Sequence, residues 1–91
     1  MNVVVEIPSV LQSRCGVPAE LRIPAASLGE LFEVLRVRFP ELHHSICDET
    51  GHVRRHVNLF HNSSLMTDKN PSSVSLTEGD VVHIFQAVSG G

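Results

Sequence analysis

The sequence contains no tryptophan and no tyrosine, and its 91 residues include four phenylalanines. Proteins that bind single strands of nucleic acid stack the bases on aromatic rings, and nucleic-acid surfaces in general need clustered basic residues. Here six arginines and one lysine are scattered along the chain, and the formal net charge is -3. We therefore expect no nucleic-acid partner.

Long apolar runs are also missing. No segment approaches the roughly 20 apolar residues that span a bilayer. The segment Met1 to Pro8 has no basic residue and carries Glu6 within its apolar run, which excludes a secretory signal. The two cysteines, Cys15 and Cys47, are too few for a disulfide framework. These absences predict a cytoplasmic protein with free thiols and no membrane partner.

The length and composition are those of one small globular domain. Hydrophobic residues make up 42% of the chain and charged residues 19%, which argues against disorder. A core of this size leaves little room for a deep catalytic cavity. We expect a binding or carrier module rather than an enzyme.

The first quarter of the chain has the pattern of two strands. Val3 to Ile7 is rich in β-branched residues and stops before Pro8, and Leu21 and Ile23 alternate with polar neighbours. The polar stretch 12–18 between them contains Gly and Pro and is typical of a turn. We predict an antiparallel hairpin.

A helix is predicted from Ser27 to Phe39. Ser27 and Glu30 have the spacing of a capping box, in which the hydroxyl and the carboxylate satisfy free backbone amides at the first turn. An apolar stripe follows at helical spacing: Leu28, Leu31, Phe32, Leu35 and Phe39. Pro40 ends the helix, and residues 41–51 have no clean period. We interpret them as an irregular loop with room for one helical turn.

The second half of the chain has the pattern of strands again. Apolar and polar residues alternate over residues 54–60, which predicts a strand, and residues 61–64 are typical of a tight turn. A short strand is predicted at residues 65–66 and the last strand at residues 81–85. The order of elements predicts an α+β fold, in which one mixed sheet packs on one main helix. The β-grasp (ubiquitin-like) roll has this order. We place this domain at residues 1–86 and a flexible tail at 87–91.

The six histidines and two cysteines are the candidate ligands for a metal site. The neighbours His43 and His44 point in different directions, and no Cys-x-x-Cys pair is present. Nothing near Cys15 or Cys47 indicates an activated thiol. We expect no bound metal, no bound cofactor and no catalytic residue in this chain.

Three side chains are predicted to form an exposed patch. The apolar residues that alternate toward the helix are Val57, Leu59, Val82 and Ile84. Strand parity then sends Phe60, His83 and Phe85 to the opposite face. Exposed apolar groups framed by polar ones favour a partner-docking surface. The alternative is that Leu65 or Met66 covers one of the rings.

The sequence closes with small and polar residues after the last strand, namely Gln86, Ala87, Val88, Ser89, Gly90 and Gly91. Two terminal glycines have no side chain to obstruct a narrow channel, and their carboxylate is unhindered. Such an end is well suited to reach the active site of another enzyme. The alternative is a glycine-rich end that frays and does nothing.

Four segments together resemble the MoaD/ThiS family of sulfur carriers. Gly79 to Gly91 resembles the family's ending, a Gly-Asp pair, an apolar strand, a small-residue tail and Gly-Gly. Arg54 to Asn62 resembles its third strand and turn, Asn2 to Pro8 its opening strand, and Ser27 to Leu31 the start of its helix. The carriers of the cysteine-biosynthesis type look most similar. One departure is Gln86, where many relatives have proline.

This resemblance implies a function for the tail. A ubiquitin-activating-like enzyme would use ATP to adenylate Gly91, and a sulfur donor would leave a thiocarboxylate there. A sulfur-transfer or synthase enzyme would then receive Gly90, Ser89 and Val88 in its active site and pass the sulfur to an acceptor. The resemblance implies a monomer when free. The acceptor stays open among cysteine, molybdopterin, thiazole and other thio-compounds.

Two other functions remain open at this point. The chain could be a protein modifier that is joined to target lysines through Gly91. It could also be a plain interaction domain whose tail is inert. Deleting Gly90 and Gly91 separates the last function from the other two.

Overall fold

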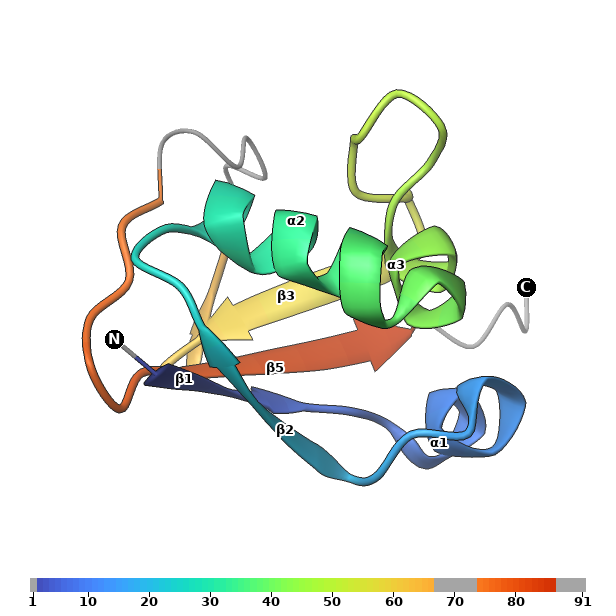
Figure 1. The fold of residues 1–91 in the computed structure, drawn as a ribbon, viewed down its shortest axis with the longest axis horizontal. Helices are drawn as coiled ribbons and strands as arrows, with labels where there is room; N and C mark the ends of the chain where they lie inside the picture. Colours follow the sequence, from blue (N-terminus) through green and yellow to red (C-terminus); the bar gives the residue numbers. More distant parts are fainter. Residues whose placement is uncertain (1, 67–73, 87–91) are drawn as a thin grey trace.

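The computed structural model describes residues 2–66 and 74–86. Within them, five strands and three helices form one mixed sheet with helices packed on it (Figure 1). The elements are β1 Asn2–Glu6, α1 Ser9–Cys15, β2 Glu20–Pro24, α2 Leu28–Arg38, α3 Pro40–Ile46, β3 Val57–His61, β4 Ser64–Leu65 and β5 Val81–Gln86. The strand order is β2-β1-β5-β3-β4, with β1 and β5 parallel and the other pairs antiparallel. The predicted α+β class with a mixed sheet is confirmed.

β1 and β2 pair as an antiparallel ladder, as predicted, but the connection between them is not a simple turn. Residues Ser9–Cys15 form the helix α1, which buries Leu11 in the core. The helix ends at Gly16, whose φ of 66° is left-handed, and the Gly16 amide donates to the Gln12 carbonyl at 2.9 Å. The prediction missed α1 because a seven-residue helix with one buried side chain has too short an apolar stripe to show a period.

The main helix α2 begins where the capping pattern predicts. The Ser27 hydroxyl accepts a hydrogen bond from the Glu30 amide at 3.1 Å. The Glu30 carboxylate accepts one from the Ala26 amide at 3.2 Å, one residue earlier than in a standard capping box. Four residues of the predicted stripe are buried, and Phe39 is partly buried against the same core. This helix therefore crosses one face of the sheet and fixes the other face as the open one (Figure 1).

The segment after α2 was predicted as an irregular loop, and this prediction was wrong for its first half. Pro40 ends α2 and is also the first residue of α3, a position where a missing backbone amide costs nothing. The helix α3 buries Leu42 and Ile46. The irregular part is confined to residues 47–56, which form isolated bridges and turns.

The remaining strands lie close to their predicted positions. β3 starts at Val57, three residues later than expected, and β4 is Ser64–Leu65, one residue earlier. The turn between them holds Asn62 at φ 49° and Ser63 at φ 76°. As predicted, the side chains that β3 and β5 send into the core are Val57, Leu59, Val82 and Ile84. Within the described residues, no helix is long and apolar enough to cross a membrane.

Candidate functional site

The open face of the sheet carries the three residues predicted as a patch. Phe60 and Phe85 meet edge to face with ring centroids 5.2 Å apart, and the His83 ring stacks on Phe85 at 6.0 Å. The strand register explains this, because Phe60 lies opposite His83 on the paired strands β3 and β5. We call Phe60, His83 and Phe85 the aromatic patch. Its role in docking stays a prediction.

Within the aromatic patch, Phe85 is open to solvent, whereas Phe60 and His83 are partly buried. The Phe85 side chain is 51% exposed, and the patch lines a shallow pocket of about 270 Å³ together with Ser63. Met66 turns into the core, and its amide donates to the Leu59 carbonyl at 2.8 Å. Leu65 pairs with Phe60 across β3 and β4 and is itself 52% exposed. The alternative of a covered patch therefore does not apply to Phe85.

A contact between a histidine and a carboxylate borders the aromatic patch on the β1 side. The Nε2 atom of His83 lies 2.9 Å from Oε1 of Glu6. Both side chains are about one-third exposed, so the contact is partly screened by water. It holds the imidazole ring between the carboxylate of β1 and the phenyl rings of β3 and β5. The patch is thus apolar on one side and acidic on the other.

A second group of contacts, which sequence reasoning missed, fixes the turn beside the patch. The Asp80 carboxylate accepts a hydrogen bond from the side-chain NH₂ group of Asn62 at 3.0 Å. It also accepts bonds from the backbone amide and the hydroxyl of Thr77, at 2.9 Å each. It also lies 2.8 Å from Nε2 of His61. These contacts hold the pKa of the Asp80 carboxyl far below its usual range, and the bond to His61 is the largest cause. The Thr-x-x-Asp spacing and the turn-forming Asn62 were the available signals.

Asn62 completes this network by joining the turn to β5. The side-chain oxygen of Asn62 accepts a hydrogen bond from the Val81 backbone amide at 2.8 Å. The Asn62 backbone amide donates to the Val81 carbonyl at 2.9 Å. The network therefore ties Asn62 to the start of β5, and Ser63, the next residue, lines the patch pocket.

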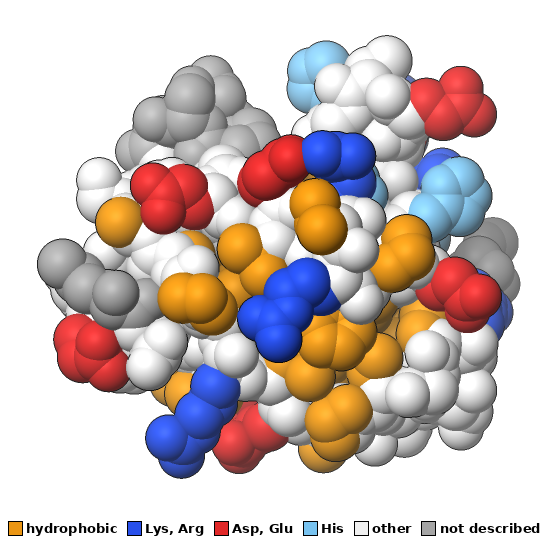
Figure 2. Space-filling view, in the orientation of Figure 1, with side chains coloured by type: hydrophobic (Ala, Val, Ile, Leu, Met, Phe, Trp, Pro, Cys, Tyr) orange, Lys and Arg blue, Asp and Glu red, His pale blue; other side chains and the backbone are white. Residues whose placement is uncertain are grey.

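The histidines outside the patch are spread over the surface. Figure 2 shows histidine side chains at separate places near the loop that follows α3. His52 and His56 are four residues apart, but they lie in the irregular segment, where Nδ1 of His52 contacts the Thr50 hydroxyl at 2.7 Å. Among the residues that the structure describes, no group of three or more His, Cys, Asp or Glu side chains is placed to hold a metal ion.

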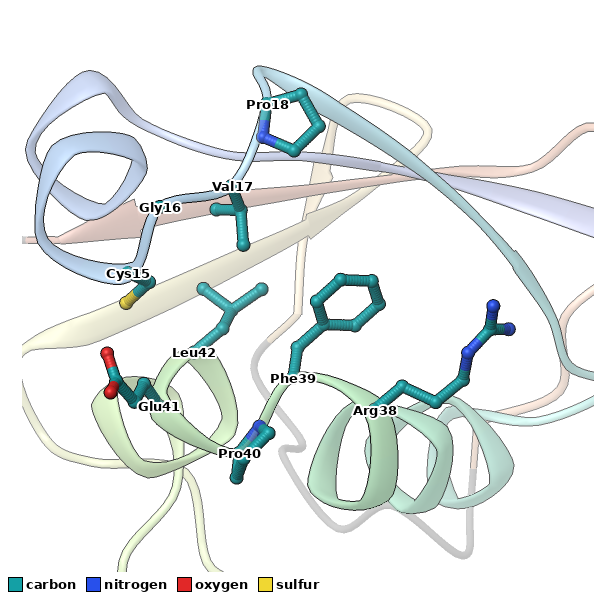
Figure 3. Close-up of a pocket in the computed structure, with 9 residues that line it drawn as sticks. All are labelled: Cys15, Gly16, Val17, Pro18, Arg38, Phe39, Pro40, Glu41 and Leu42. Carbon is teal, nitrogen blue, oxygen red and sulfur yellow. The ribbon is translucent and has the colours of Figure 1, made fainter.

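The two cysteines lie near the end of the molecule where α1 and α3 meet. Cys15 borders a pocket of about 270 Å³, shown in Figure 3, whose apolar wall includes Val17, Phe39 and Leu42. Its Sγ atom is 3.7 Å from the Ser45 hydroxyl. Cys47 is fully buried, and burial raises the pKa of its thiol to about 11. Such a thiol stays protonated at neutral pH and is a poor nucleophile.

The predicted tail lies outside the described residues. This applies to Val88, Ser89, Gly90 and Gly91, and their predicted role in a partner's active site stays a prediction. The last described residue is Gln86, which ends β5 and pairs with Val57. β5 runs toward the end of the molecule where α1 and α3 lie (Figure 1).

Comparison with known protein families shows which family this chain belongs to. The model of the ThiS family matches residues 16–91. The chain belongs to the ThiS family. A curated relative is the sulfur carrier protein CysO of Mycobacterium tuberculosis, which is 27% identical over 93 residues and is matched over 100% of both chains. The predicted family is confirmed.

Solved structures confirm the predicted β-grasp fold. SAMP1 of Haloferax volcanii matches with a TM-score of 0.81 and 20% identity over 100% of both chains. The CysO complex with BexX from Amycolatopsis orientalis matches with a TM-score of 0.82 and 22% identity, over 98% of this chain and 99% of that one. The second of these neighbours was crystallised with a partner protein, as its name states.

Proposed function

We propose that this ThiS-family chain is a sulfur carrier whose Gly91 carboxylate is converted to a thiocarboxylate. The observation that supports this most is the family match itself, which extends through Gly90 and Gly91. The full-length similarity to the sulfur carrier protein CysO agrees with it. In this proposal the chain is a substrate and carrier for enzymes and binds no cofactor of its own.

The chemistry needs an activating step because a carboxylate is a poor electrophile. An adenylating enzyme would join the Gly91 carboxylate to the AMP part of ATP and release pyrophosphate. A hydrosulfide or another sulfur donor would then attack the acyl carbon and expel AMP, leaving sulfur in place of one carboxylate oxygen. ATP serves as the co-substrate of the adenylating enzyme.

The folded domain and the tail have separate parts in this proposal. The aromatic patch is the surface on which the adenylating enzyme docks, because it is apolar, exposed and built on rigid strands. Val88, Ser89 and Gly90 would enter the partner's active site, where small side chains allow a narrow channel. A second enzyme, a sulfur transferase or synthase, would use the same tail when it takes up the sulfur.

Mass spectrometry of the intact chain tests the proposal. The chain is incubated with the adenylating enzyme of its own organism, ATP and sulfide. We expect a mass increase that corresponds to one oxygen replaced by sulfur, and none without ATP. A variant that lacks Gly90 and Gly91 is the control and should stay unchanged. If the full chain with its cognate enzyme and ATP keeps its original mass, the proposal is wrong.

A protein modifier is the second candidate function. SAMP1 of Haloferax volcanii, a small archaeal modifier protein, has the same fold, so the fold fits this function as well. In that case the activated Gly91 would form an amide bond with lysines of target proteins. Denaturing gels that show chain-containing ladders in cells would support it, and ladders should vanish when Gly90 and Gly91 are deleted.

A further inference from the structure

One row of side chains crosses the whole open face of the sheet. The register places Glu20 opposite Glu6, Glu6 beside His83, His83 opposite Phe60, and Phe60 opposite Leu65. Paired residues share a face, so all five side chains point away from the helices. The row passes from two carboxylates through an imidazole to two apolar side chains. Two members of the aromatic patch, Phe60 and His83, belong to this row, and Phe85 lies in the neighbouring row opposite Asn58.

The acidic half of the row is not explained by folding. Glu6 and Glu20 lie directly opposite each other, and like charges in that position destabilise a sheet. His83 contacts Glu6, but among the described residues no basic side chain forms an ion pair with Glu20. Arg22 is on the same face but belongs to the next row, opposite Val4. A carboxylate pair in this setting has unused capacity to bind a cation.

The spacing of the row defines what would fit it. Neighbouring strands lie about 4.8 Å apart, so Glu6 and Phe60, two strands apart, are separated by about 10 Å. In an extended segment, side chains two residues apart share a face and start about 6.6 Å apart, at about 3.3 Å per residue. The length of an Arg or Lys side chain covers the rest of the distance. The pocket lined by Phe60, Ser63, His83 and Phe85 can accept one apolar side chain at the far end.

We propose that this face binds a partner segment that presents an apolar side chain and, about 10 Å away, the cationic group of an Arg or Lys. The apolar side chain enters the patch pocket, and the cation contacts the carboxylates of Glu6 and Glu20. This inference rests on the proposed docking role of the face and specifies the chemistry of the partner. The carboxylates select the partner by charge, while the rings supply most of the apolar contact.

A peptide titration tests this recognition without any sulfur chemistry. The probes are two extended tripeptides, acetyl-Phe-Ala-Arg-amide and acetyl-Phe-Ala-Glu-amide, added to the isotope-labelled full chain and followed by NMR. We expect the Arg peptide to shift the amides of β1, β3 and β5 and to bind about two- to fivefold more tightly than the Glu peptide. Glu6→Gln should remove most of this preference while keeping a hydrogen-bonding oxygen next to His83.

Glu49→Gln is the matched control, because it changes the net charge equally from an exposed site in the loop after α3. It should keep the preference for the Arg peptide. Equal binding of the two peptides, equal effects of the two variants, or no shifts on this face would each overturn the inference. The chain without Gly90 and Gly91 should give the same titration, so a failure of the thiocarboxylate proposal is recognised separately.

Discussion

Asp80→Asn is expected to destabilise the domain because no orientation of an amide can replace the carboxylate. Oδ1 of Asp80 accepts from the Asn62 side chain and the Thr77 hydroxyl, and Oδ2 accepts from the Thr77 amide and contacts His61. An asparagine has one oxygen, so its NH₂ group must face donors on one side. The carboxylate is only 13% exposed, so water replaces little of what is lost.

The size of the effect follows from the contacts that are lost. A hydrogen bond to a charged group contributes on the order of 1.5–3 kcal/mol, and the asparagine keeps part of the set. We expect the free energy of unfolding to fall by about 2 kcal/mol. For a domain of this length, that corresponds to a drop in Tm of roughly 10 °C. Because the chain has no tryptophan or tyrosine, unfolding is followed by far-UV circular dichroism in urea or on heating.

Asp48→Asn is the matched control. Asp48 also accepts several hydrogen bonds, from Thr50 and His52, but all its partners lie within one exposed loop. The network of Asp80 instead ties the turn after β3 to β5. The control should unfold close to the wild type. Equal unfolding of Asp80→Asn and the wild type, or an equal loss in both variants, would refute the reasoning.

The pH dependence gives a further check on the same residue. The pKa of Asp80 is lowered in the folded state, so its contribution is fully present above the ordinary aspartate value of 3.8. As the pH falls below that value, the unfolded chain takes up a proton that the folded chain does not. The difference in free energy of unfolding between the wild type and Asp80→Asn should therefore decrease by about 1.4 kcal/mol for each pH unit of acidification below that value. A gap that widens on acidification would contradict this sign.

Substitutions at two further sites, each with a control, test docking and helix capping separately. Phe85→Ala should slow adenylation by the activating enzyme. It should lower the free energy of unfolding by less than about 1 kcal/mol, because Phe85 is half exposed. Val37→Ala is the control at an exposed apolar position on α2, and it should change neither the adenylation rate nor the stability. Large unfolding of Phe85→Ala would show that the ring supports the core. Ser27→Ala should cost about 1 kcal/mol in urea unfolding through loss of the helix cap, and Ser27→Thr should restore most of it.

The sequence predicts the parts of this fold that have a long apolar period. The helix α2 buries four residues of one stripe, and β1, β2, β3 and β5 each alternate over five or six residues. The short helices α1 and α3 could not be predicted in this way. They bury one and two residues, and tertiary contacts rather than periodicity stabilise them.

In the candidate site, too, a local sequence pattern predicts some features, whereas others depend on tertiary contacts. Parity within β3 and β5 was enough to place Phe60, His83 and Phe85 on one face. The contact of Glu6 with His83 depends on the parallel pairing of β1 with β5, which no local pattern encodes. The Asp80 network likewise depends on how the turn at Asn62 meets the start of β5, a contact between residues 18 positions apart.

The two cysteines provide a last test, since they differ in their access to water. Cys47 is fully buried and has a pKa raised to about 11, whereas Cys15 lies at a surface pocket. At pH 8, iodoacetamide should label one thiol of the native chain, both in concentrated urea, and none in native Cys15→Ser. Native labelling of Cys47 at the rate of Cys15 would refute the burial argument. If Cys15→Ser still gains sulfur when the activating enzyme, ATP and sulfide are present, Cys15 is not the acceptor and the buried Cys47 is a poor one. That result would agree with a thiocarboxylate at Gly91.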